Sequence, residues 1–96
     1  MNIPEMIREK RKDILKLADQ HGASNIRIFG SVARNESKED SDLDLLVNMG
    51  PGRTLFDHAA LIQDLQNMLG CKVDVALESG LKDRVRARVL REAIPL

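Results

Sequence analysis

A short apolar segment that ends in Gly30-Ser31, followed ten residues later by Asp42-Leu43-Asp44, most constrains the fold of this chain. Residues 25–29 have the pattern of a short strand, and Gly30 permits a tight turn with close backbone approach directly after it. Asp42 and Asp44 begin a second segment in which apolar and polar residues alternate. Because positions i and i+2 of a strand point to the same face, these two carboxylates should project side by side.

The two motifs together suggest a site for phosphate and metal. Two carboxylates this close repel each other, and a divalent cation between them removes the repulsion. Mg²⁺ binds one or two carboxylates together with substrate phosphates and water. Gly30 and Ser31 can supply free N–H groups to an anion if a helix begins there. The structural alternative is an ordinary turn, with Asp42 capping a loop and Asp44 solvated on an edge strand. The joint pattern favours metal-assisted transfer from a nucleoside triphosphate.

The hydrophobic pattern predicts one domain over residues 1–96, in the order α-β-α-β-α-β-α. Four helices are expected to begin near Pro4, Gly30, Thr54 and Leu81. Three strands are expected at residues 25–29, 42–47 and 72–77, with a polar loop at 36–41 and a break at 50–52. This order predicts an α/β or α+β fold with a small mixed sheet of about three to four strands, covered by helices. The pattern leaves the strand directions open.

Helical spacing also predicts which residues face the core. In the first helix, which Gly22 should end, these are Ile3, Ile7, Ile14, Leu17 and Ala18. In the third helix, which Gly70 should end, they are Leu55, Ala59, Ile62, Leu65 and Leu69. In the last helix they are Leu81, Val85 and Val89. Thr54 and Asp57 have the spacing of a short capping box at the start of the third helix.

The composition excludes several classes of protein. The chain has 15 basic and 15 acidic residues, which argues against a polybasic membrane or nucleic-acid coat. Phe29 and Phe56 are its only aromatic residues, so a stacking platform for single-stranded nucleic acid is not expected. The single cysteine, Cys71, cannot form an internal disulfide and should be a small buried residue. With no apolar run of membrane-spanning length and no signal-like start, a cytoplasmic protein is expected.

Two sequence blocks resemble a known family. Gly30-Ser31-Val32-Ala33-Arg34 and Ser41-Asp42-Leu43-Asp44-Leu45-Leu46-Val47 look like the signature of the nucleotidyltransferase superfamily that includes DNA polymerase β. Within it, the chain is most similar to the minimal nucleotidyltransferase (MNT) proteins of prokaryotes. The order of elements around the signature is similar over nearly the whole chain. Asn35 departs from the pattern, since many relatives have Gly there, and should affect the loop rather than the chemistry.

The resemblance implies roles for particular residues. Asp42 and Asp44 would hold two Mg²⁺ ions, while Gly30, Ser31 and nearby backbone would bind the triphosphate. A third carboxylate, Asp74, would be the second-metal ligand and would activate the attacking hydroxyl. Its place between two valines on the third strand lets it share a face with the metal pair. The alternative for Asp74 is an exposed position in an alternating strand.

The remaining charged and histidine residues have weaker signals. Arg34 could reach a phosphate, or it could pair with an acidic residue among Glu36, Glu39 and Asp40. A basic stripe on the last helix could be a solvated face, or it could dock an acidic partner or RNA; it consists of Arg84, Arg88 and Arg91. His21 is expected at the C-terminus of the first helix, where the dipole favours it, and His58 on a helix surface.

The family implies a specific activity. Its members would move AMP from ATP onto a hydroxyl with Mg²⁺, releasing pyrophosphate. In the MNT group the acceptor is typically a HEPN-domain ribonuclease toxin, adenylylated on a tyrosine, so the chain would be an antitoxin. A chain of 96 residues leaves little room for an acceptor domain, so a partner or a second copy is expected to supply that site. Two alternatives stay open: a non-catalytic antitoxin that binds the toxin, and an enzyme acting on a small molecule, such as an aminoglycoside, or on tRNA.

Overall fold

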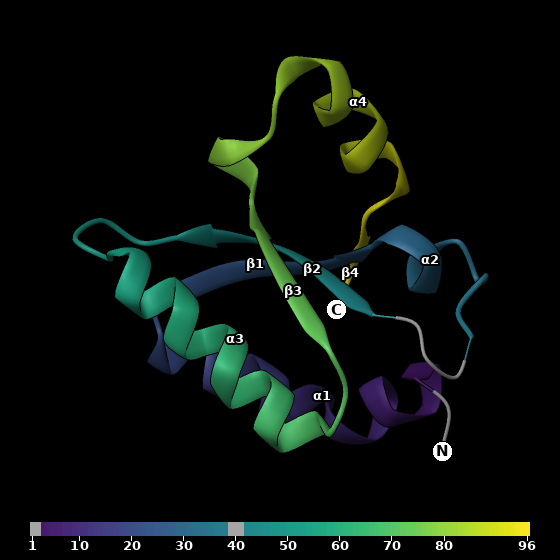
Figure 1. Ribbon diagram of the computed structural model, residues 1–96, viewed down its shortest axis with the longest axis horizontal. Helices are drawn as coiled ribbons and strands as arrows, with labels where there is room; N and C mark the ends of the chain where they lie inside the picture. Colours follow the sequence, from purple (N-terminus) through teal and green to yellow (C-terminus); the bar gives the residue numbers. More distant parts are fainter. Residues whose placement is uncertain (1–2, 39–41) are drawn as a thin grey trace.

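One mixed sheet of four strands, in the order β3-β2-β1-β4, organises the protein (Figure 1). The computed structural model describes residues 3–38 and 42–96. The strands are β1 (Ala23–Phe29), β2 (Leu43–Met49), β3 (Val73–Leu77) and β4 (Ile94–Pro95). The helices are α1 (Ile3–Gln20), α2 (Gly30–Ala33), α3 (Leu55–Leu69), the 3₁₀ helix η1 (Glu78–Gly80) and α4 (Asp83–Glu92). Among these residues, no helix has the length and hydrophobicity that a membrane crossing requires.

The strand directions, which the sequence left open, follow from the connections. β1 and β2 pair antiparallel, whereas β2 and β3 pair parallel, with α3 as the crossover that a parallel pair needs. The fourth strand, β4, pairs antiparallel with β1 at Arg27 and Ile28. The predicted fold class and order of elements are confirmed. β4 itself was not predicted, because two residues are too few to show an alternating pattern, and Pro95 is tolerated only at a sheet edge.

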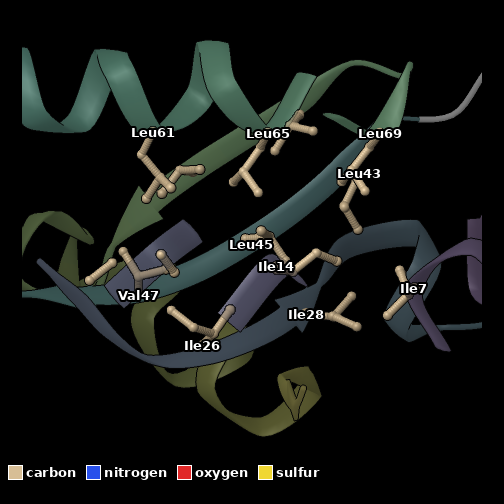
Figure 2. Close-up of a cluster of buried hydrophobic side chains, with 14 of the residues drawn as sticks. Ile7, Ile14, Ile26, Ile28, Leu43, Leu45, Val47, Leu61, Leu65 and Leu69 are labelled. Carbon is tan, nitrogen blue, oxygen red and sulfur yellow. The ribbon is translucent and has the colours of Figure 1, made fainter. Parts of the chain in front are cut away.

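The main core lies between one face of the sheet and the helices α1 and α3 (Figure 1). Figure 2 shows apolar side chains of α3 pointing down onto those of β1 and β2. Among the described residues, the largest side chains that are less than 2% exposed are Ile14, Leu43, Leu45, Leu46, Val47, Leu61 and Leu65. All but Leu46 belong to this first face. Burial of such side chains is the main source of stability in a small domain.

The predicted core stripe of α3 is partly wrong. Leu65 and Leu69 are buried as predicted, but the third member of their row is Leu61. Leu55 is 81% exposed and Ala59 is also exposed, while Ile62 is half-buried. At about 100° per residue, position 59 lies roughly 160° around the helix from position 61. Leu55 is the first residue of α3 and precedes the buried part of the helix. The true stripe follows the i, i+4 spacing of the three leucines.

The helix boundaries were predicted more accurately than the helix faces. Thr54 caps α3 through a capping box with Asp57, and Gly70 ends the helix in the left-handed conformation at φ 69°. In α1, four of the five predicted core residues are buried and Leu17 is half-buried, while Met6 is an additional buried residue. α4 starts at Asp83, so Leu81 precedes it, and of its predicted core residues only Val89 is buried. Of the predicted loop at 36–41, residues 36–38 are irregular and 39–41 lie outside the described residues.

A bulge in β1 directs Arg27 to the second face of the sheet. The register with β2 shifts between Ser24 and Arg27, and Asn25 has a φ of 52°. Arg27 is 8% exposed, and its guanidinium donates to Glu78 and Asn48 as well as to the Asn25 carbonyl. This hydrogen bonding lowers the pKa of the Glu78 carboxyl. Part of the second face is therefore covered by the ion pair of Arg27 and Glu78, whose hydrogen-bonding groups have partners, rather than by a continuous apolar layer.

α4 covers this second face from above. It lies on the opposite side of the sheet from α1 and α3 (Figure 1). Arg86 of α4 donates to the Glu78 carbonyl at 2.8 Å, so Glu78 contacts two arginines. Val89 of α4 and Leu46 of β2 are the buried apolar residues outside the main core cluster. Asp44 and Asp74 lie on the part of the second face nearer the beginnings of β2 and β3.

Candidate active site

Asp44 and Asp74 occupy directly paired positions on the neighbouring parallel strands β2 and β3. In a sheet, paired residues point to the same face, and adjacent strands lie about 4.8 Å apart. The paired residues Leu45 and Val75, one step along, are buried in the core, so the aspartates point to the second face. Asp74 is exposed and Asp44 is half-buried. The structure thus places two of the three candidate carboxylates side by side.

Asp42 lies two residues before Asp44, directly ahead of β2, and is exposed. Burial raises the pKa of Asp44 above its ordinary range, and the charges of Asp74 and Asp42 raise it further. Arg34 acts in the opposite direction. Asp44 therefore responds to the charges of both other carboxylates, although Asp74 lies 30 residues further along the chain.

Gly30 brings the turn after β1 against this pair. Its φ is 76°, which L side chains rarely adopt, and a Cβ at this position would collide with the Asp44 carboxylate. Phe29, the residue before it, pairs directly with Asp44 across the antiparallel strands. Both the backbone conformation and the close approach therefore require glycine here. The predicted link between the Gly-Ser turn and the aspartates is present in the fold.

The backbone positions of the candidate aspartates are close together, but their carboxylate groups do not converge on a single point. Within residues 3–38 and 42–96, no three His, Cys, Asp or Glu side chains gather tightly enough to hold a metal ion as they stand. Their donor chemistry suits Mg²⁺, because all three candidates offer carboxylate oxygens on one sheet face. The raised pKa of Asp44 indicates a place where added positive charge would be favourable.

Glu92, at the end of α4, is a site residue that sequence reasoning missed. Its Oε1 accepts a hydrogen bond from the Gly30 N–H at 2.8 Å and another from Arg34 Nη1 at 2.9 Å. Glu92 also contributes to the raised pKa of Asp44. A carboxylate on the last helix has no local pattern that links it to a turn 62 residues earlier. Only the packing of α4 on the sheet brings it there.

Arg34 and Ser31 occupy the turn as expected. Ser31 is the second residue of α2 and is half-buried. Arg34 follows α2 and pairs with Glu36 at 3.1 Å, one of the predicted structural partners, and with the unpredicted Glu92. Its other predicted partners, Glu39 and Asp40, lie outside the described residues. The structural pairing of Arg34 is confirmed, and the charge of its guanidinium partly offsets the effects that raise the pKa of Asp44.

The two histidines and Cys71 have structural contacts. His21 follows α1 as predicted, and its Nε2 lies 2.8 Å from Asp64 Oδ2 of α3. His58 was predicted as a surface residue, but it is half-buried and its Nε2 lies 2.6 Å from the Val75 carbonyl oxygen. Cys71 is only partly buried, although it packs against the core, and burial raises the pKa of its thiol.

The basic stripe is on the helix that covers the second face. Arg84, Arg88 and Arg91 are all exposed on α4, at a spacing that aligns them on one helix side. Arg91 immediately precedes Glu92, whose carboxylate reaches the Gly30 turn, whereas Arg84 lies at the other end of the helix.

A cavity of about 370 Å³ lies elsewhere, between the start of α1, α2 and β4. Its lining is mostly apolar and consists of Pro4, Ile7, Arg8, Ile28, Val32, Ala33, Asn35 and Ile94. None of the three aspartates lines it. The chemistry of the carboxylates therefore belongs to an open face of the sheet rather than to this cavity.

The sequence pattern of the nucleotidyltransferase domain matches residues 7–96. The chain belongs to the nucleotidyltransferase domain family. A Methanocaldococcus jannaschii protein, provisionally named a protein adenylyltransferase, is 43% identical over 94 residues, covering 98% of this chain and 97% of its own. The protein adenylyltransferase MntA of Thermococcus cleftensis is 38% identical over 79 residues, covering 82% and 80%. The resemblance inferred from the two sequence blocks is confirmed at the level of the family.

Solved structures agree with the fold of this nucleotidyltransferase domain. A structure provisionally described as a minimal nucleotidyltransferase is 55% identical and superposes with a TM-score of 0.87, covering 96% of this chain and 94% of its own. A crystal structure described as a toxin-antitoxin with AMP-PNP has a TM-score of 0.76 at 21% identity, covering 88% and 69%. At that identity the second match supports the shared fold alone.

Proposed function

We propose that this domain is a Mg²⁺-dependent protein adenylyltransferase that transfers AMP from ATP to a hydroxyl of a HEPN-domain toxin, and so acts as its antitoxin. The observation that carries the proposal is the direct pairing of Asp44 with Asp74, beside a turn that must be glycine at position 30. Charged groups gathered on one face oppose folding, so their presence favours a catalytic role over a purely structural one. The adenylyltransferase names of full-length relatives support the same reaction.

Each residue has a part in the reaction. Asp42, Asp44 and Asp74 would hold Mg²⁺, which would neutralise charge on the triphosphate and on the leaving pyrophosphate. Gly30, Ser31 and Arg34 would bind phosphate oxygens through the backbone N–H, the hydroxyl and the guanidinium. Asp74 is the most exposed of the paired aspartates, so it is accessible to an incoming acceptor.

The chemical step is a substitution at the α-phosphorus of ATP. The acceptor oxygen forms a bond to this phosphorus, the bond to the β-phosphate oxygen breaks, and pyrophosphate leaves. The hydroxyl proton passes to a carboxylate oxygen of Asp74, which acts as general base. We propose a tyrosine hydroxyl as the acceptor. A partner would supply it, because Asp42 and Asp74 lie on an open face that a second protein can reach.

Incubation with the co-encoded toxin, ATP and Mg²⁺ tests the proposal, with the intact mass of both proteins as the readout. The toxin is expected to gain one or more AMP masses when ATP, Mg²⁺ and the wild-type domain are all present. The matched control is Asp44→Asn, which should bind the toxin without modifying it. Neutralisation of the toxin by this variant at equal concentration, with no mass change, would instead establish a contact-only antitoxin. Efficient modification of tRNA or an aminoglycoside without the toxin would establish the third possibility.

The basic stripe is the proposed docking surface for the toxin. Reversal of Arg84, Arg88 and Arg91 to Glu should weaken the complex while leaving the affinity of the isolated domain for ATP unchanged. The chain offers a matched control on the opposite side of the sheet: reversal of Arg8, Lys12 and Lys16, three exposed cations of α1. Equal loss of toxin binding in both triple variants would show a general effect of net charge rather than docking on α4.

A further inference from the structure

The Glu92 carboxylate accepts hydrogen bonds from Gly30 and Arg34 that a bound anion could accept in its place. One carboxylate oxygen accepts from the backbone N–H of Gly30 at 2.8 Å and from the guanidinium of Arg34 at 2.9 Å. The Glu92 side chain is 18% exposed, so most of its surface is covered by the protein. A main-chain N–H and a guanidinium are donors that phosphate oxygens also accept from.

We infer that the Glu92 carboxylate occupies the phosphate position of the Gly30 turn in the nucleotide-free domain, and that a triphosphate binds by displacing it. This inference rests on the proposed function, which assigns Gly30 and Arg34 to the triphosphate. The Gly30 N–H is a single donor and cannot serve the Glu92 oxygen and a phosphate oxygen equally well. Competition for it makes Glu92 an internal inhibitor of nucleotide binding.

The charges around the turn indicate that Glu92 competes with a triphosphate rather than assisting its binding. Glu92 adds a negative charge to a face that already carries Asp42, Asp44 and Asp74. A triphosphate brings several more negative charges to the same place, so Glu92 is repelled as the nucleotide arrives. If Glu92 only positioned the turn, it would do so at the expense of the Gly30 N–H, which could otherwise donate to a phosphate oxygen.

The position of Glu92 makes its release simple. It is the last residue of α4, and the next residue, Ala93, closes the helix with a hydrogen bond to Val89. Rotation of the Glu92 side chain can free Gly30 and Arg34 without unpairing β4 from β1. The exchange therefore requires no rearrangement of the sheet.

A matched pair of variants tests the inference. Glu92→Gln and Glu36→Gln each remove one negative charge from a partner of Arg34. The two partners differ because Glu92 also accepts a hydrogen bond from the Gly30 N–H. The probe is inorganic tripolyphosphate with Mg²⁺, followed by ATP with Mg²⁺, and the dissociation constant is measured by titration calorimetry. Circular dichroism confirms that each variant is folded, and Glu92→Ala provides a second variant at the same position.

Glu92→Gln and Glu92→Ala should tighten the binding of tripolyphosphate about tenfold, because charge-assisted hydrogen bonds to the turn are lost. Glu36→Gln should change the dissociation constant less than about twofold, since it leaves the Gly30 contact in place. Unchanged or weaker binding in both Glu92 variants would overturn the inference and make Glu92 a positioning residue. Equal tightening by Glu36→Gln would also overturn it, because net charge alone would then explain the gain. Failure of the wild type and every variant to bind either probe would overturn the proposed function as well.

Discussion

The two faces of the sheet are built from the same strands but have opposite chemistry. On β2, Leu43, Leu45 and Val47 point toward α1 and α3, while Asp44 and Asn48 belong to the other face. The first face is a continuous apolar layer that water does not reach. On the second face, burial and, after it, the charges of Asp74 and Asp42 raise the pKa of Asp44. The period of two in a strand thus separates the residues that stabilise the fold from those proposed to do chemistry.

The second face is itself divided into two parts. Near η1 and α4, Arg27 is buried but all sides of its guanidinium have hydrogen-bond partners. Near the starts of β2 and β3, like charges gather instead, and Glu92 adds a further carboxylate. A fold selected only for stability would not place acidic groups together in this way. The comparison predicts that substitutions on the two faces separate activity from stability.

The largest expected effect is on catalysis. The double variant Asp42→Asn, Asp44→Asn should reduce AMP transfer below detection, because both proposed metal ligands lose their charge. Its thermal midpoint should be unchanged or slightly higher, since the substitution relieves repulsion with Asp74. Transfer is measured from the mass of the toxin and stability from thermal unfolding. Full activity in this variant would end the proposal of metal-assisted catalysis.

The Asp74→Asn variant tests whether Asp74 accepts the proton of the acceptor hydroxyl or instead binds the nucleotide. Loss of a general base should lower turnover by roughly 10² to 10⁴, with little change in the affinity for ATP. The measurements are single-turnover transfer to the toxin and titration with ATP and Mg²⁺. If affinity collapses while bound nucleotide still reacts at the normal rate, Asp74 is a binding ligand and the assigned role is wrong.

Leu65→Ala is the corresponding change on the first face. Leu65 is 1% exposed in the core below β2 and β3. Its truncation should lower the free energy of unfolding by about 2 to 5 kcal/mol, because it leaves a cavity in a packed core. Denaturant unfolding measures the loss. At a temperature where the variant is folded, transfer per folded molecule should be near that of the wild type; a specific loss of transfer would contradict the separation of the faces.

The smallest expected effect is at the cap of α3, away from both faces. Thr54→Ala should cost about 1 kcal/mol of stability through loss of the side-chain cap.

The pH dependence of the same cap depends on Asp57. The Thr54 N–H donates to Asp57 and is the largest cause that lowers the pKa of the Asp57 carboxyl. Because this pKa is below its unfolded value, the stabilisation is present above the unfolded pKa and is lost as the pH falls through the folded one. The stability difference between wild type and Asp57→Asn, measured by denaturant unfolding, should therefore shrink in acid; a constant difference would rule out an ionised cap.

Local signals predicted most of the fold, and long-range packing decided the rest. Thr54, Gly70 and the alternation around Asp44 act within a few residues, so the chain sequence alone predicts them. That Asp74 can share a sheet face with Asp42 and Asp44 followed from alternation together with the family resemblance, whereas its direct pairing with Asp44 depends on the sheet register. Glu92 could not be predicted, because its contact with Gly30 depends on how α4 packs on the sheet. The face of α3 was misjudged because several apolar residues offered more than one possible stripe.

The bulge at Asn25 has a consequence for the solubility of the sheet. Within the described residues, β4 pairs with β1 only at Arg27 and Ile28, so the first part of β1 lies beyond its cover. An uncovered strand edge is a template on which another chain can add a strand and begin to aggregate. The positive φ of Asn25 interrupts the regular strand in this part. The irregularity that aims Arg27 at the second face therefore also makes the open edge a poor template for self-association.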